Sequence, residues 1–282
     1  MSDFLDSELS SAERNIAGAK FVVVPMPLER TVSYGSGTAN GPNAIVEASN
    51  ELERICPEGE PCLAGIATVD PIDCTGELPE VMARLARQTE TIAAQGKIPV
   101  TLGGEHSLTF GAVTGVANAL GRKVGIVQID AHADLRIAYQ GEKHSHASVM
   151  HLLCEDGHSL AQYGVRALCQ QEVKSRAKYG VTFIDGEELV TNNIQSVTLP
   201  DDFPNDIYIS FDVDGLDPSI MPATGTPVPG GLGYYQALNI VKSALKGRRC
   251  VGMDIVELAP NRESQAWDFT TAQITYRMMG MV

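Results

Sequence analysis

The sequence lacks the marks of a membrane protein and of an exported protein. None of its apolar runs approaches the roughly 20 residues that a helix needs to cross a bilayer. The amino-terminal stretch MSDFLDSELSSAERN is acidic and polar, and it contains neither the basic segment nor the apolar segment of a signal peptide. We therefore expect a cytoplasmic protein that has no membrane partner.

Positive charge is scarce and scattered. The chain has 21 Lys and Arg against 35 Asp and Glu, a formal net charge of −14, and no basic cluster that could follow a phosphate backbone. We therefore expect no nucleic-acid partner. The negative balance would attract a small cationic substrate, although acidity that serves only solubility explains it equally well.

The cysteines show no CxxC spacing that would indicate a zinc site or a redox motif. They are Cys56, Cys62, Cys74, Cys154, Cys169 and Cys250. Reduced thiols are expected in a chain without an export signal. Cys56 and Cys62 share one irregular segment, so a local bridge between them stays open as an alternative, but no function is expected to depend on it.

Length and composition favour one α/β domain over residues 1–282. The chain is 44% apolar and only 20% charged, which suits a large buried core. Strand-like and helix-like segments alternate without an internal repeat or a linker, and this alternation predicts a parallel sheet covered by helices on both faces. Strands are expected at residues 20–25, 98–103, 124–130, 206–214 and 250–258. Helices are expected at residues 41–55, 79–95, from the GGEHS turn to 120, at 234–247 and at 267–279.

The loop at residues 26–41 is long and rich in glycine. Loops of this length in compact domains are more often functional than idle, so we expect it to form a wall of the site. Tyr34 and Ser36 are candidates to line the pocket, and a role as ordinary turn residues is the alternative.

Six acidic and histidine side chains follow three of the expected strands: His106, Asp130, His132, Asp134, Asp212 and Asp214. Asp130, His132 and Asp134 are spaced by two, so in extended backbone they would project to the same face. Because the carboxyl ends of parallel strands share one edge of a sheet, the six are expected to converge. Carboxylates repel one another at short range, so a cation is needed to hold them together.

Four carboxylates and two imidazoles form a hard, oxygen-rich ligand set that suits Mn²⁺ better than a structural zinc ion. Two metal ions are the natural number for six ligands, and a pair can lower the pKa of a water molecule between them. The alternative, in which these residues only cap turns and helix ends, is plausible for any one of them but not for the set.

Three segments resemble signatures of the ureohydrolase family, which includes arginase and agmatinase: GGEHS, DAHAD and SFDVDGLDPSIMPATGTPVPGG. The resemblance runs from Val23 to the carboxyl terminus. It implies a three-layer α/β/α arginase-like sandwich with a parallel sheet of about eight strands. It also implies two Mn²⁺ ions per subunit and a homo-oligomer, either a trimer or a hexamer. Asp134 and Asp212 are the expected bridging ligands.

The resemblance extends to the expected catalytic residues, which are His146, Asp134 and Glu257. His146 in KHSHASVM matches the family's proton-carrying histidine, with a surface-loop histidine as the alternative. Glu257 follows the last expected strand, where its carboxylate can pair with a guanidinium group. Asp254, two residues before the strand end, is expected to be a structural partner.

Agmatine, cleaved to urea and putrescine, is the expected substrate. The chain has no Asn in the GEKHSHAS stretch, where arginases carry one for the substrate carboxylate, and its ELAP segment resembles agmatinase. The segments DLRIAYQG and SVMHLLCE depart from agmatinases, so 4-guanidinobutyrate and arginine stay open. A metal-binding relative without activity is a further alternative, and a one-zinc deacetylase-like use of the fold is disfavoured by the complete ligand pair.

Overall fold

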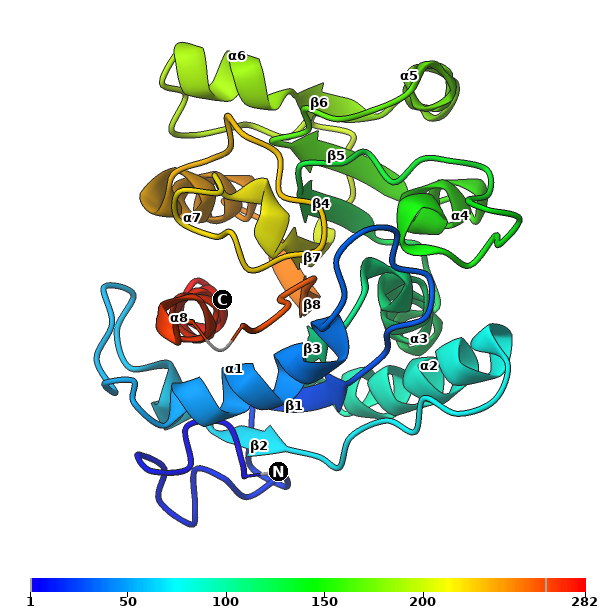
Figure 1. Cartoon of the computed structure of the whole chain (residues 1–282). Helices are drawn as coiled ribbons and strands as arrows, with labels where there is room; N and C mark the ends of the chain where they lie inside the picture. The colour runs from blue at the N-terminus through cyan, green and yellow to red at the C-terminus, as the bar shows by residue number, and fades with distance from the viewer. Residues whose placement is uncertain (1, 262) are drawn as a thin grey trace.

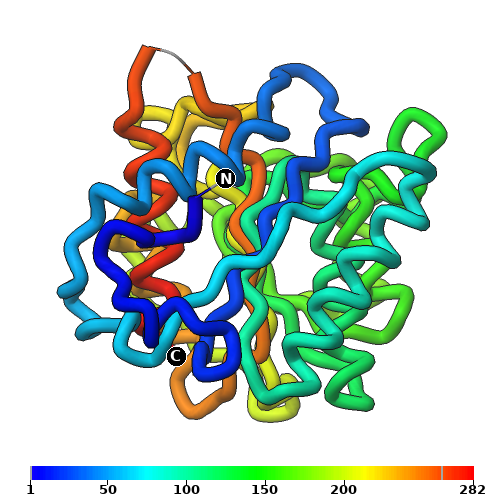
Figure 2. The backbone as a smooth tube through the Cα atoms, turned by 90° about the horizontal axis from the view of Figure 1, so that it is seen from below, coloured from blue at the N-terminus to red at the C-terminus, as the bar shows by residue number. Residues whose placement is uncertain are grey.

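The computed structural model describes residues 2–261 and 263–282, and within them a single parallel sheet of eight strands forms the centre (Figure 1). The strand order is β2-β1-β3-β8-β7-β4-β5-β6. The strands are β1 (Phe21–Met26), β2 (Ile66–Thr68), β3 (Ile98–Gly103), β4 (Gly125–Ile129), β5 (Ser159–Tyr163), β6 (Thr182–Ile184), β7 (Asp206–Asp212) and β8 (Arg249–Val256). Figure 2 shows β1, β3 and β8 side by side although they are far apart in the sequence.

Helices cover both faces of the sheet. They are α1 (Gly41–Ser49), α2 (Leu78–Ala94), α3 (Thr109–Leu120), α4 (Val149–Glu155), α5 (Gln170–Tyr179), α6 (Gly186–Thr191), α7 (Tyr234–Ala244) and α8 (Ala266–Gly280). One face packs against α1, α6, α7 and α8, and the other against α2, α3, α4 and α5 (Figure 1). The expected three-layer α/β/α architecture is therefore confirmed. In the described part of the chain, no helix is long and apolar enough to span a bilayer.

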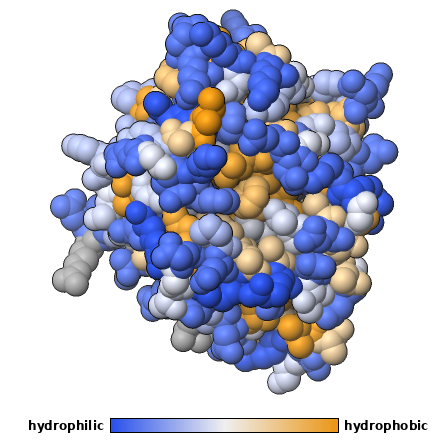
Figure 3. All heavy atoms as spheres, turned by 90° about the vertical axis from the view of Figure 1, so that its right-hand side faces the viewer, coloured by the Kyte–Doolittle hydropathy of each residue, from blue (hydrophilic) through white to orange (hydrophobic). Residues whose placement is uncertain are grey.

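The sheet is buried on both sides because its strands alternate side chains between two apolar layers. In β1, Phe21 and Val23 join the layer under α1 and α8, whereas Val22 and Val24 join the layer under α2 and α3. Helix α2 turns its apolar positions inward in the same way. On the outer side of this second layer, hydrophilic residues cover most of the surface, with hydrophobic ones between them (Figure 3).

The expected helices and strands differ from the structure in several places, and helices α4, α5 and α6 were not expected. The first helix ends at Ser49 rather than at residue 55, and a loop follows. Strands β2 and β6 were not expected; each has three residues and lies at an edge of the sheet, where short strands are common and carry a weak pattern. Strand β5 was also not expected. All six cysteines have free thiols, so the alternative bridge from Cys56 to Cys62 does not form.

The strand order places four strand ends next to one another. Strands β3, β8, β7 and β4 are neighbours in the middle of the sheet, and all are parallel. The segments that follow them therefore leave the same edge side by side. Those segments carry His106, Glu257, Asp214 and Asp130, respectively. The topology thus brings together residues that lie up to about half the chain apart.

Candidate metal centre

The structure brings the six expected metal ligands together at this edge. Two groups of three residues have ligand atoms within 4.8 Å of one another: His106, Asp130 and Asp212 form one, and Asp130, His132 and Asp214 form the other. Asp130 belongs to both groups. Two neighbouring positions for a cation that share one carboxylate are therefore present.

Three carboxylates surround the first imidazole. Nδ1 of His106 lies 3.1 Å from Asp130 Oδ2, 2.9 Å from Asp134 Oδ2 and 3.4 Å from Asp212 Oδ2. This nitrogen is buried and makes no hydrogen bond of acceptable geometry with any described group. A buried polar atom without a partner needs an explanation, and a cation bound among these oxygens supplies one. The second imidazole is placed similarly, with His132 Nδ1 2.9 Å from an oxygen of Asp214.

The opposite nitrogen of His106 fixes the orientation of the ring. His106 Nε2 lies 2.8 Å from Ser210 Oγ, and Ser210 donates a hydrogen bond of 2.8 Å to Asp254 Oδ1. A carboxylate behind a ligating histidine orients the ring and raises the basicity of the metal-binding nitrogen. Asp254 thus has the structural position that was expected for it, and Ser210 is the link that the sequence did not reveal.

The backbone that carries the acidic ligands is not the extended strand that the spacing of two suggested. Strand β4 ends at Ile129, and Asp134 has a left-handed conformation with φ 52°. Asp214 lies on the short 3₁₀ helix Val213–Gly215, where its N–H donates to Asp212 Oδ1 at 2.8 Å. The side chains converge through tight turns instead, so the expected common face in a strand was wrong although the expected convergence was right.

The expected pair of bridging ligands also needs a correction. Asp130 lies between the two imidazoles, with one oxygen 3.1 Å from His106 and the other 3.6 Å from His132. The carboxylate of Asp134 contacts only His106 among the histidines of the site. The geometry therefore favours Asp130 over Asp134 as a carboxylate shared between two cations. Spacing in the sequence could not distinguish them, because the choice depends on the turn after β4.

The charges of the site favour bound cations. Burial and the neighbouring charge of Asp130 raise the pKa of Asp134 to about 7, and burial with the charges of Asp214 and Asp130 raises that of Asp212 well above its usual range. Burial lowers the pKa of His132, but its contacts with Asp130 and Asp214 outweigh this and raise it to about 12. Without a metal ion, protons take the place of the missing positive charge.

Adding a divalent cation such as Mn²⁺ to chelator-treated protein is expected to raise its melting temperature by on the order of 10 °C at a concentration about a thousand times Kd. Without the cation, the melting temperature is expected to fall as the pH rises from about 5 to about 8. The reason is that the pKa values of Asp134 and His132 are higher in the folded state than in the unfolded state. Their protonated forms therefore stabilise the folded protein at low pH, and this stabilisation is lost as the pH rises toward the folded-state pKa values of about 7 and about 12. Differential scanning calorimetry with and without cation measures both effects.

The control is the cation-loaded protein over the same pH range, in which these carboxylates are ionised throughout and the decline should disappear. A metal-free protein that is equally stable or more stable at the higher pH would show that the buried carboxylates do not lack a cation. So would the absence of any shift in melting temperature on adding Mn²⁺.

Glu257 and His146 lie beside the ligands. Both line a narrow cavity of about 20 Å³ together with four of the ligands, which are His132, Asp134, Asp212 and Asp214. Glu257 follows β8 with φ 66°, and its Oε1 accepts the backbone N–H of His106 at 2.7 Å. Burial raises the pKa of Glu257 to about 8, although that hydrogen bond lowers it. Burial also lowers the pKa of the His146 imidazole.

A larger cavity of about 360 Å³ shares His132, Asp134 and His146 with the narrow one. It is roomy enough for an extended ligand tail. Its wall carries one more carboxylate, that of Glu172, and the guanidinium of Arg136, which lies 5.5 Å from the ring centre of Tyr139. The loop at residues 26–41 forms part of the site, as expected: Tyr34 lines the narrow cavity, whereas Ser36 is not among its lining residues.

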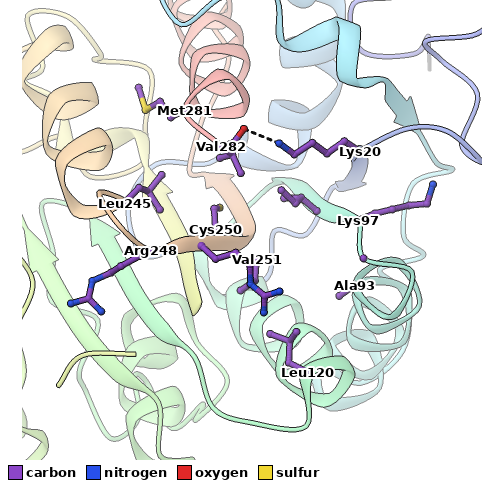
Figure 4. A pocket seen from close by; sticks show the side chains of 13 residues that line it. Lys20, Ala93, Lys97, Leu120, Leu245, Arg248, Cys250, Val251, Met281 and Val282 are labelled. Atoms are coloured by element: carbon purple, nitrogen blue, oxygen red, sulfur yellow. Dashed lines mark hydrogen bonds between the residues drawn. The ribbon is translucent and has the colours of Figure 1, made fainter. Parts of the chain in front are cut away.

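Another cavity, of about 450 Å³, lies at the opposite edge of the sheet, where β1, β3 and β8 begin (Figure 4). No Asp, Glu or His lines it. Its basic groups already have partners: Lys20 donates to the main-chain oxygen of Val282, and Arg249 to Asp206. The side-chain ends of Lys97 and Arg248 point away from its centre (Figure 4). This cavity therefore lacks the acidic and histidine side chains that line the two cavities beside the metal ligands.

Two residues next to His146 were missed from the sequence. Thr31 Oγ1 lies 3.2 Å from His146 Nδ1, and the same hydroxyl donates to Glu105 Oε1 at 2.8 Å. Glu105 is fully buried. In the sequence, only its position next to His106 in GGEHS could have indicated a role for Glu105. The direction of a single side chain cannot be predicted from its position in a motif.

Comparisons with known proteins identify the family of the chain. The Arginase family model matches residues 19–280. The N(1)-aminopropylagmatine ureohydrolase of Synechocystis sp. is 36% identical over 98% of this chain and 92% of that protein. The agmatinase of Pyrococcus horikoshii is 30% identical over 98% of this chain and 96% of that protein. The crystal structure of agmatine ureohydrolase of Thermoplasma volcanium superposes with a TM-score of 0.84 at 28% identity, over 100% of this chain and 94% of that one. The chain belongs to the arginase family and is an agmatinase-like ureohydrolase.

Proposed function

We propose that the protein hydrolyses the terminal guanidino group of agmatine with the help of two Mn²⁺ ions, giving urea and putrescine. The observation that carries the proposal is the meeting of two adjoining ligand groups with Glu257 and His146 around one narrow cavity. The relatives named agmatinase support the same class of substrate.

The donor set fits a pair of hard divalent cations. His106, Asp130, Asp134 and Asp212 would hold one ion, and His132, Asp214 and the shared Asp130 the other. Oxygen ligands with two imidazoles suit Mn²⁺. When bound, the two ions supply positive charge that lowers the pKa of a water molecule and stabilises negative charge that develops during hydrolysis.

In this proposal, Glu257 binds the guanidinium group. Its Oε1 already accepts the backbone N–H of His106, which holds the carboxylate in one orientation. The remaining lone pairs can receive parallel N–H groups of a planar guanidinium, a two-pronged geometry that orients the cation as well as binding it. A bound cation would also favour the ionised form of this buried carboxylate. Glu257 would thus hold the guanidinium carbon above the metal ligands.

In this proposal, His146 carries a proton. Its ring lines both cavities, so it lies beside the narrow site and beside the path of the substrate tail. Burial lowers the pKa of the imidazole, which favours the neutral form that can accept a proton. The leaving group of the reaction is an amine, which needs that proton when the carbon–nitrogen bond breaks.

N(1)-aminopropylagmatine is a second candidate substrate, favoured by a specific observation. Two relatives that are 36% identical to the chain, from Synechocystis and Thermus thermophilus, are N(1)-aminopropylagmatine ureohydrolases. The 360 Å³ cavity next to the metal centre offers space for the longer tail of this compound. The same guanidino chemistry serves both substrates, so only the tail distinguishes them.

We expect urea release from agmatine and from N(1)-aminopropylagmatine with kcat/KM at least about tenfold above that for arginine and 4-guanidinobutyrate, because relatives are named for agmatine-type substrates and the net charge of −14 favours a cationic tail over a carboxylate tail. The measurement is urea production by the Mn²⁺-loaded protein across the four compounds. Fastest hydrolysis of 4-guanidinobutyrate would show that Arg136 selects an anionic tail instead. Bound metal without urea from any guanidine would indicate a member without activity.

A further inference from the structure

A buried carboxylate lies behind His146, belongs to neither candidate ligand group and lines neither of the two cavities beside them. Glu105 has no exposed surface, and four donors surround its two oxygens. Oε2 accepts the backbone N–H groups of Arg30 at 2.5 Å and Thr31 at 2.6 Å. Oε1 accepts the hydroxyls of Thr31 at 2.8 Å and Ser107 at 2.5 Å. Since backbone N–H groups can only donate, Glu105 acts as an acceptor toward this loop.

The hydroxyl of Thr31 is therefore oriented. A threonine hydroxyl has one hydrogen to donate and two lone pairs to accept with. Its hydrogen goes to Glu105 Oε1, which leaves only lone pairs for the other two neighbours of Oγ1. These are the backbone N–H of His146 at 3.0 Å and the ring nitrogen Nδ1 of His146 at 3.2 Å. Both neighbours must act as donors.

The orientation of this hydroxyl determines the protonation of the imidazole. A neutral imidazole carries its proton on one nitrogen only, and the partner of that nitrogen selects which one. Because Thr31 Oγ1 can only accept from Nδ1, the proton resides on Nδ1 and Nε2 keeps a free lone pair. Tyr139 meets the ring in an edge-on arrangement with centres 5.4 Å apart, which limits rotation away from Thr31.

We propose that Glu105 and Thr31 are positioning residues that hold His146 as the Nδ1–H tautomer, with Nε2 as the nitrogen that exchanges the proton in the cavity. The inference rests on the proposed function only in calling His146 the proton carrier. The opposite tautomer would present an N–H at Nε2 and could not accept a proton there. Two residues that touch neither metal nor substrate would thus control the proton transfer.

The direct test is the tautomer itself. Long-range ¹H–¹⁵N correlation spectra of the full-length protein labelled with ¹⁵N-histidine distinguish a protonated ring nitrogen from a bare one. The spectra are recorded for the metal-free protein and for the protein with Mg²⁺, because Mn²⁺ would broaden the signals. His146→Asn identifies the His146 resonances among the 6 histidines of the chain. We expect a protonated Nδ1 and a bare Nε2, and a protonated Nε2 would overturn the proposal.

Kinetics provide the second test. Thr31→Val keeps the side-chain shape and removes the hydroxyl, so kcat should fall by about 10- to 100-fold while KM changes by less than about twofold. Thr31→Ser restores the hydroxyl and should return kcat to within about threefold of the original. The matched control is Thr38→Val in the same loop, because the Thr38 hydroxyl is buried and donates to Glu29 rather than contacting His146. Its kcat should not change.

The kinetic test and the spectroscopic test can each contradict the proposal independently of the other. If Thr31→Val keeps its kcat, or if Thr31→Ser loses as much as Thr31→Val, the positioning role is wrong. If the Thr31 variants do not fold, the spectrum of the original protein still decides the tautomer. If the protein releases urea from no guanidine, the proposed function fails, whereas the tautomer assignment can still be read from the spectra.

Discussion

Asp130→Asn is expected to lower kcat for urea release by about 10³-fold or more, which corresponds to roughly 4 kcal/mol of transition-state stabilisation. Asp130 is the carboxylate common to both ligand groups, so the substitution removes one negative charge from each of them. The amide is similar in size and can still accept the N–H of His132, which the Oδ1 oxygen now accepts at 2.6 Å. Measurement combines steady-state urea production with the metal content of the purified protein.

Metal content should fall together with turnover in this variant. Asp156→Asn is the matched control, because Asp156 is exposed, pairs with Lys123 and lies away from the cavities. That variant should retain both metal and activity. Asp130→Asn with full metal content and full turnover would show that the shared carboxylate is not a ligand, and the proposal of a two-metal centre would then have to be abandoned.

Glu257→Gln is expected to lower kcat/KM by about 10²-fold, roughly 3 kcal/mol, without changing the metal content. The amide oxygen of Gln can keep the hydrogen bond from the His106 backbone. Its NH₂ group, however, would face the N–H groups of a guanidinium, and the charge-assisted pair would be lost. The measurement is the full dependence of urea release on substrate concentration, accompanied by metal analysis.

The combination of results distinguishes this role from the others. Retained metal with a large loss in kcat/KM identifies a substrate-binding group, whereas joint loss of metal and activity would place Glu257 among the ligands. Glu29→Gln serves as the control, because Glu29 is another carboxylate in the same region and accepts N–H groups of Gly37 and Ala39 at some distance from the cavities. A Glu257→Gln protein with unchanged kcat/KM would exclude guanidinium pairing by this residue.

The sequence sufficed for the architecture and for the convergence of the ligands. Buried parallel strands are runs of apolar residues, and β3, β4, β7 and β8 are such runs. Because their carboxyl ends meet at one edge of the sheet, acidic residues directly after them had to lie close together. Neither step depends on the details of the turns.

Details of the turns are where the sequence was insufficient. The left-handed backbone at Asp134 is unusual for a residue other than glycine, and propensity alone does not predict it. It turns Asp134 toward His106 and leaves Asp130 between the two imidazoles. Thr31 and Glu105 are 74 residues apart, and only the packing of the loop after β1 against the end of β3 brings them into contact. No spacing within a motif contains that information.

The position of β8 has a consequence for the synthesis of the chain. It comes after the other seven strands of the sheet in the sequence, yet it lies in the centre of the sheet, paired with β3 on one side and β7 on the other. Before it emerges, β2, β1 and β3 can pair with one another, as can β7, β4, β5 and β6, but the two groups have no strand to join them. His106 is therefore expected to stay apart from Asp130 until β8 forms, and complete metal binding is expected only after residues 249–256 have been made.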